Sequence, residues 1–182
     1  MAKSCVASID VRLGQRFQIP RRARLDRLDH FSPSHLKDLE MYKEEHLVLI
    51  GDHFVLHPRQ FVLGETLEWV HLPKGYAAYV NGRSSWGRCG LIIATATGIH
   101  PYYSGVLTLE ITNVGEIPLY LYPGLTIAQL FIHEVTHVEG EQPTPSPTSG
   151  NVKASNVDAA GPDKAIIQKI ARSRGLPNTA ER

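Results

Sequence analysis

Two arginines, Arg83 and Arg88, stand five residues apart in the segment Asn81–Gly90, and two serines follow the first of them. Guanidinium groups match phosphate and carboxylate oxygens in pairs, and free backbone N–H groups at a helix start attract anions. Ser84 and Ser85 stand where such a helix would be capped. The segment is therefore a candidate site for a triphosphate or a carboxylate. On its residue types alone, however, a capped surface turn with two solvated arginines is a slightly better interpretation.

A second candidate for chemistry is Glu110, which lies in the stretch Leu107–Thr112. This stretch alternates apolar and polar residues, as a half-buried strand does, and Glu110 falls on its polar side. One carboxylate can both remove a proton and return it, which is the work of a general base and acid. Without further evidence, the simplest interpretation of Glu110 is a solvated glutamate on the polar face of an edge strand.

Short β-rich stretches, separated by glycine and proline turns, surround these groups and must position them. Such a pattern is typical of an antiparallel sandwich or barrel, so the predicted fold class is all-β with few short helices. The expected strands are Ser8–Leu13, Leu47–Ile50, Phe54–Leu56, Gln60–Leu63, Ala77–Val80, Leu91–Ala94, Val106–Thr112, Leu119–Tyr122 and Thr126–His133. Between the first two, Pro20–Asp29 is expected to be a solvated loop and Pro33–Glu45 a polar helix.

The chain is expected to hold one compact domain followed by a linker and a helix. We expect the domain over residues 1–140, a Pro/Ser/Thr-rich linker over 141–161, and a helix with a tail over 162–182. In the last part, Pro162–Arg174 has the spacing of a short amphipathic helix. A lone helix of this length is marginal in water, so we expect it to dock on its own barrel or on a neighbouring subunit.

Composition argues against several classes of protein. The 19 Lys and Arg nearly balance the 18 Asp and Glu, whereas a nucleic-acid binder is normally clearly basic. No apolar run approaches the ~20 residues that a membrane helix needs, and the first residues lack the apolar core of a secretory signal. Two cysteines, Cys5 and Cys89, make no disulfide framework. We expect a cytoplasmic protein without a nucleic-acid or membrane partner, in which Cys89 is buried and Trp69 and Trp86 are core or interface residues.

Several segments match a known family in order and spacing. Arg83–Arg88 fits an Arg-Ser-Ser-x-x-Arg signature, Ser8–Gly14 an opening strand, and Phe61–Glu68 the strand before the signature. Thr95–Gly105 fits a deoxyribose-binding turn. The order is completed by Leu107–Glu110 and Pro123–Leu130. Together, over roughly residues 8–133, these motifs resemble the dCTP deaminases, relatives of the dUTPases. The resemblance implies a dUTPase-like distorted β-barrel or jelly roll.

The resemblance also implies hydrolytic deamination of dCTP to dUTP and ammonia. Glu110 aligns with the catalytic glutamate of the deaminases, and Ser84 and Arg88 would help to hold the base, the water and the phosphates. The nucleotide-binding residues implied in the same way are Arg83, Ser84, Ser85, Arg88, Ala96, His100, Tyr103, Thr108, Leu109 and Gln129. Zinc deaminases carry a C-x-x-C pair, and this sequence has none, so we expect a metal-free reaction without zinc.

Partners and cofactors follow from the same resemblance. In this family the sites lie between subunits, so a homotrimer is implied. Magnesium would be held through the triphosphate of the nucleotide rather than by a cage of protein groups. The expected ligands are dCTP and dUTP, and dTTP is a candidate inhibitor.

The sequence departs from the family pattern at three places. His100 replaces an aspartate that orients the attacking water in dUTPases, so hydrolysis of dUTP is not expected. Gln142–Arg182 has no counterpart of the tyrosine, lysine and glutamine that fold over the triphosphate, and only seven residues precede the opening strand. These departures leave two alternatives open. One is a catalytically silent or regulatory nucleotide-binding relative, and the other, less favoured, is a dUTPase-like pyrophosphatase.

The segment His133–His137 spells H-E-x-x-H, the signature of zinc metalloproteases. That motif works on a helix, where residues four apart can share one metal. Here the motif continues the β-rich run Thr126–Phe131, and in a strand the two histidines would stand about 13 Å apart. We therefore expect no protease site.

Overall fold

The computed structural model describes residues 4–5, 7–20, 43–95, 98–136, 166, 169–170 and 172–173. The chain forms two compact units, of which the first comprises Met1–Ile19 and Glu45–Ser155 and the second Pro20–Glu44 and Asn156–Arg182. The described residues of the second unit from 166 onwards are helical. They agree with the helix expected over Pro162–Arg174, the rest of which lies outside the described residues. The boundaries expected at 141 and 162 stay a prediction.

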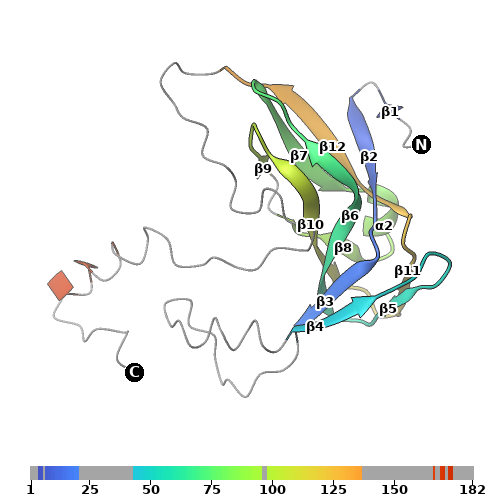
Figure 1. Ribbon diagram of the computed structural model, residues 1–182. Coiled ribbons are helices and arrows are strands. Elements are labelled where there is room, and N and C mark those ends of the chain that lie inside the picture. Colours follow the sequence, from blue (N-terminus) through green and yellow to red (C-terminus); the bar gives the residue numbers. More distant parts are fainter. Residues whose placement is uncertain are drawn as a thin grey trace. The chain divides into compact units, whose positions relative to one another are not determined.

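Antiparallel strands build the first unit (Figure 1). One sheet holds, in spatial order, β1 (Ser4–Cys5), β2 (Ser8–Arg12), β12 (Thr126–Glu134), β7 (Tyr76–Gly82) and β9 (Gly98–Ile99). A second sheet holds β4 (Lys43–Leu47), β3 (Arg16–Pro20), β6 (Phe61–His71), β10 (Ser104–Asn113) and β8 (Leu91–Ile93). A two-stranded sheet pairs β11 (Leu119–Leu121) with β5 (Phe54–Leu56). A short helix, α2 (Ser84–Gly87), follows β7 in the chain.

The buried apolar residues come from alternate positions of strands in all three sheets. On β10 every second residue is buried, from Gly105 to Asn113, as a half-covered strand requires. The largest fully buried apolar side chains are Phe17, Leu13, Leu56, Leu109, Ile111, Leu121, Ile127, Val11 and Val62. One shared core between antiparallel sheets is the architecture of a sandwich or distorted barrel, so the predicted all-β fold is confirmed.

The chain passes from the first sheet to the second at Leu13, directly after β2. The N–H of Leu13 donates to the carbonyl of Leu125 and its carbonyl accepts from Gly124, while Gly14 donates to the carbonyl of Glu65. Leu13 itself is fully buried. These bonds hold the end of β2 against the start of β12 in the first sheet and against β6 in the second, so the two sheets are joined at this point.

The expected strands are largely confirmed, and β5 has the predicted bounds. β1, β3 and β9 were not expected, and the strand expected over Leu47–Ile50 is wrong, because it meets β4 only at Leu47. β6 runs for 11 residues instead of stopping near Leu63. The strand continues through Gly64, where the absence of a side chain allows close packing against β10. A Cβ at this position would stand only 3.0 Å from Ile111 Cδ1.

The polar helix expected over Pro33–Glu45 is wrong at its end, because Lys43–Leu47 forms β4. β4 is the outer strand of its sheet, a position where charged side chains keep contact with solvent. The remainder of that range, and the loop expected over Pro20–Asp29, lie outside the described residues apart from Pro20, which ends β3.

Within the described part of the chain, no helix combines the length and apolar character needed to span a bilayer. The H-E-x-x-H segment begins in a strand, since His133 and Glu134 close β12.

Candidate nucleotide site

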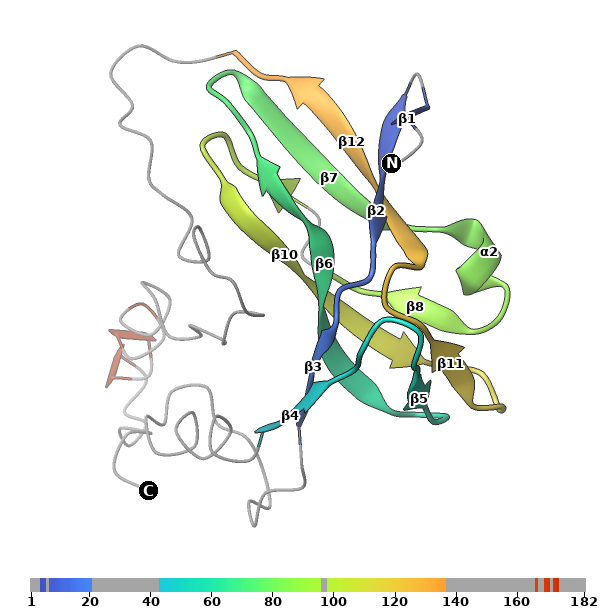
Figure 2. The same ribbon diagram turned by 45° about the vertical axis from the view of Figure 1, so that its right-hand side comes forward.

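The two-arginine loop leaves the end of β7, forms the single turn α2, and returns to the fold along β8 (Figure 2). Arg83, not a serine, occupies the N-cap with extended backbone (φ −74°, ψ 135°), and no side chain caps the helix. The capping role expected for Ser84 and Ser85 is therefore wrong. A helix of four residues has little macrodipole, so an anion bound here would depend mainly on the arginine side chains.

Backbone and side-chain bonds fix this loop at both ends. At its start, the N–H of Arg83 donates to the carbonyl of Ile127 at 3.1 Å, and Trp86 Nε1 donates to the carbonyl of Thr126 at 3.0 Å. At its end, Gly90 accepts from the N–H of Val114 at 2.9 Å. Trp86 is half-buried against the core, as expected. The loop is thus held by β12 and by the end of β10.

Arg83 and Gln129 share a common partner, Asp10 on β2. Nη1 of Arg83 lies 2.8 Å from Oδ2 of Asp10, and Nε2 of Gln129 donates to Oδ1 at 2.9 Å. The Asp10 side chain keeps only 18% of its exposure. Two predicted nucleotide-binding residues, from the signature loop and from β12, are thereby brought together.

The other loop residues face solvent. Ser84, Ser85 and Arg88 are exposed, and Arg88 is available to an anionic ligand. Cys89 is also exposed, so its predicted burial is wrong, and its thiol lies 3.5 Å from the carbonyl of Ser85. The reason is that the turn after α2 points outward, before the chain re-enters the core at Leu91.

Glu110 lies in the other sheet, on β10, where it is half-buried. Its N–H donates to Thr95 Oγ1 at 3.0 Å, and its carbonyl accepts from Ala94 at 2.8 Å. β10 lies between β6 and β8, so the simplest interpretation of Glu110, as a glutamate on an edge strand, is wrong. The carboxylate stands on a central strand with its backbone fixed.

The predicted deoxyribose turn divides into an exposed and a buried part. His100 is exposed, whereas Tyr103 is 5% exposed and its hydroxyl donates to the carbonyl of Val106 at 2.6 Å. Tyr102 between them adopts a left-handed φ of 66°. Ala96 lies outside the described residues. Thr108 is half-buried beside Glu65 in the β6–β10 register, and Leu109 is fully buried.

Sequence reasoning missed Asp10 as a member of the site. The available signal was its place on the polar side of the opening strand, among residues that match the family. Among the described residues, no group of three or more His, Cys, Asp or Glu side chains could hold a metal ion.

Comparisons with known structures agree with this fold. A crystal structure of 2'-deoxycytidine 5'-triphosphate deaminase from Agrobacterium tumefaciens superposes with a TM-score of 0.53 at 23% identity, covering 72% of this chain and 41% of that chain. A dUTPase of phage 80alpha superposes with a TM-score of 0.50 at 18% identity, covering 78% and 87%. The fold is therefore of the dUTPase-like class.

The sequence comparisons are more specific. A family model described as dCTP deaminase-like matches residues 3–135, and the chain belongs to this family. It is 40% identical to a "dCTP deaminase, dUMP-forming" of Nanoarchaeum equitans, over 73% of this chain and 72% of that protein. It is 38% identical to a protein of the same name from Halobacterium salinarum, over 89% and 80%. It is 36% identical to a "dCTP deaminase" of Natronomonas pharaonis, also over 89% and 80%.

Proposed function

We propose that the protein is a dCTP deaminase that converts dCTP and water to dUTP and ammonia, with Glu110 as general base and acid. Membership of the dCTP deaminase-like family and the names of its relatives support the substrate. The observation that carries the proposal is the joint presence of the Arg83–Arg88 loop and of Glu110 on the polar side of a central strand.

Deamination requires a water oxygen to attack C4 of cytosine while N3 gains a proton. The C4–N bond then breaks, and the amino group leaves as ammonia with a further proton. The Glu110 carboxylate takes a proton from the water and returns it to the base, so one group serves both steps. Its strand is paired on both sides, which keeps the carboxylate in a fixed position for this work.

The triphosphate is assigned to Arg83, Arg88 and Gln129, and Ser84 to the base and the water. Phosphate oxygens pair with guanidinium groups through charge-assisted hydrogen bonds. Magnesium bound to the triphosphate would offset its negative charge and be held chiefly by phosphate oxygens and water.

A cytoplasmic location fits a substrate from the deoxynucleotide pool. We also propose dTTP as an inhibitor, because it shares the triphosphate and the sugar with dCTP.

Removal of the exposed arginine should weaken binding of the nucleotide itself. For Arg88→Ala we expect the KM for dCTP to rise about tenfold or more, because a charge-assisted hydrogen bond is worth about 1.5–3 kcal/mol. Steady-state kinetics measure the effect. Arg59→Ala, which changes an exposed arginine in the turn between β5 and β6, is the control. Unchanged affinity in Arg88→Ala would remove this arginine from the phosphate site.

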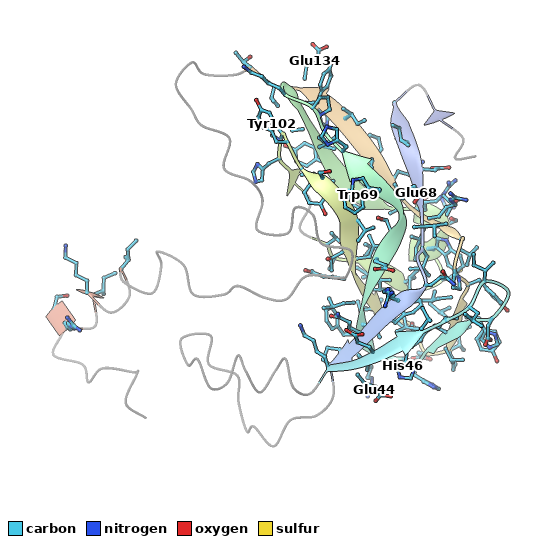
Figure 3. All side chains as sticks on the ribbon, in the orientation of Figure 1. Glu44, His46, Glu68, Trp69, Tyr102 and Glu134 are labelled. Atoms are coloured by element: carbon cyan, nitrogen blue, oxygen red, sulfur yellow. The ribbon has the colours of Figure 1, made fainter. Side chains whose placement is uncertain are left out.

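The face that carries Glu110 also carries exposed apolar side chains, which supports assembly with further copies of the chain. The register places Phe61 and Ile92 opposite Thr112, and Trp69 opposite Val106, on the same face as Glu110. Phe61, Ile92 and Trp69 are 43%, 44% and 53% exposed. Figure 3 shows Trp69 on β6, where its Nε1 donates to Ser104 Oγ of β10 at 3.1 Å. We propose that the chain forms a homotrimer in which neighbouring subunits cover this face.

In sedimentation, the proposed trimer should have three times the chain mass of 20.2 kDa. Trp69→Lys should shift the protein towards monomers and lower turnover, because a charge would be buried in the interface. Tyr120→Lys is the matched control, since Tyr120 is equally exposed at 53% but lies on β11. A monomeric protein with full activity would contradict the trimer.

The function is tested by incubating the pure protein with magnesium and dCTP and separating the products by ion exchange. dUTP with ammonia supports the proposal. dUMP, pyrophosphate and ammonia would support a dUMP-forming enzyme, a second candidate that the names of two relatives favour. Such a result would mean that His100 does not prevent hydrolysis of the triphosphate. Protection against thermal unfolding by dCTP without turnover would indicate a silent binder.

A further inference from the structure

We propose that Asp10 is a positioning residue that sets the directions of both Arg83 and Gln129 toward the nucleotide. The inference rests on the proposed function, since it assigns these two residues to the triphosphate. Asp10 is not itself a nucleotide ligand in this proposal. It acts through the two side chains that it holds.

The geometry divides the two oxygens of one carboxylate between two donors. Oδ2 of Asp10 accepts from Nη1 of Arg83, and Oδ1 accepts from Nε2 of Gln129. The bond with Gln129 follows the sheet register, in which Asp10 on β2 and Gln129 on β12 are directly opposite each other. Arg83 reaches the same carboxylate from the end of β7, which lies on the other side of β12. A single group thus connects three neighbouring strands.

The bond to Asp10 uses a small part of the hydrogen-bonding capacity of Arg83. Guanidinium carries five N–H donors in a planar fork, and one of them is bonded to Asp10. Holding one edge of the fork fixes the plane of the group, while the other N–H groups stay available to phosphate oxygens. The amide of Gln129 is oriented in the same way, because its nitrogen faces Asp10 and its oxygen must point elsewhere.

The position requires an ionised carboxylate rather than any small polar group. A carboxylate accepts on both oxygens, whereas an asparagine amide has one acceptor oxygen and one donor nitrogen. In Asp10→Asn, the amide nitrogen would face an N–H of either Arg83 or Gln129, so one of the two bonds must break. The shape of the side chain is kept, and the loss is confined to orientation and charge.

The strand supplies a matched control two residues further on. Arg12 Nε bonds Glu68 Oε1 at 2.6 Å, and the backbone N–H of Arg12 donates to Oε2 at 2.7 Å. The exposed fractions of the two side chains are 36% and 22%, close to the 36% and 18% of Arg83 and Asp10. Figure 3 labels Glu68 on β6 beside β2. This pair joins two strands as Asp10 does, but it includes no residue assigned to the nucleotide.

The test compares the steady-state kinetics and thermal unfolding of Asp10→Asn and Glu68→Gln. Asp10→Asn is expected to raise the KM for dCTP about tenfold while kcat stays within about twofold, since ground-state binding is weakened and the general base is untouched. Glu68→Gln is expected to lower Tm by about as much as Asp10→Asn does, because each variant weakens one side-chain link between strands. Unlike Asp10→Asn, it is expected to leave the KM for dCTP unchanged. Equal KM values in the two variants would overturn the positioning role.

A double-mutant cycle shows whether Asp10 acts through Arg83. If it does, Asp10→Asn should raise the KM less in an Arg83→Gln variant than in the unmodified protein, because only Gln129 is then left to be oriented. Additive effects of the two changes would overturn the inference while leaving the deaminase assignment intact. If the unmodified protein neither turns over nor binds dCTP, the proposed function fails, and this inference fails with it.

Discussion

Glu110→Gln is expected to lower kcat for dCTP about a thousandfold while changing nucleotide affinity no more than a few-fold. Glutamine has nearly the same shape but cannot take a proton from water or return one to the base, and general acid–base catalysis contributes about 10²–10⁴-fold. The fold should tolerate the change, because the bonds of residue 110 to Thr95 and Ala94 involve only its backbone. Single-turnover kinetics and dCTP binding, measured separately, give the two quantities.

A suitable control is Glu116→Gln, which makes the same chemical change at an exposed position in the turn after β10. It should leave both kcat and affinity unchanged, so any general effect of removing a negative charge would be visible. Turnover by Glu110→Gln at the rate of the unmodified protein would remove Glu110 from the mechanism. Loss of both turnover and affinity would instead place this carboxylate among the ligands of the base.

The strands of this fold were predictable wherever one face is buried and the other is not. β10 alternates strictly, so its existence and inward side could be predicted from the sequence, and its observed bounds lie within two residues of the expected ones. β6 was underestimated because its middle is buried on both faces, from Val62 to Thr66, and the alternation disappears there. The pattern along a strand also contains no information about its neighbours. The central place of β10 could therefore not be predicted.

The candidate site was predictable to the extent that it lies in one stretch of sequence. Arg83 and Arg88 share a loop whose residue types suggest an anion site, and the family signature includes both. Asp10 was missed because its partners are 73 and 119 positions away along the chain. Their contact arises from strand order, which brings β2, β12 and β7 side by side. Local patterns predict which residues can do chemistry, and the sheet topology decides which of them meet.

Gly90→Ala should destabilise the protein by about 3 kcal/mol. The φ of Gly90 is +87°, a left-handed conformation that costs an L-residue about 1–2 kcal/mol. The added Cβ would also stand 2.8 Å from the nitrogen and 2.9 Å from the Cα of Gly115. Both atoms belong to backbone, and overpacking of this kind typically costs about 1–3 kcal/mol. For a chain of this size, the combined effect corresponds to a fall in Tm of about 6–12 °C.

The clash would also disturb a buried side chain that holds this corner. Asn113 Oδ1 accepts from the N–H of Gly115 at 2.9 Å, and its Nδ2 donates to the carbonyls of Ile117 and Leu56 at 2.8 and 3.1 Å. Asn113 is fully buried, so a displaced Gly115 would leave one of its polar atoms without a partner. Since Gly90 ends the signature loop, we expect the KM for dCTP to rise together with the loss of stability.

Two further glycines separate the causes of this effect. Gly124 also has a left-handed φ, of +90°, but an added Cβ there meets nothing within 4 Å, so Gly124→Ala should show the conformational penalty alone. Gly87 lies in α2 with neither a left-handed φ nor a close neighbour, and Gly87→Ala should leave Tm unchanged or raise it slightly. The predicted order of Tm is therefore Gly87→Ala, Gly124→Ala and then Gly90→Ala, from highest to lowest. If Gly90→Ala were no less stable than Gly124→Ala, the close packing of Gly90 on Gly115 would not hold the signature loop in place.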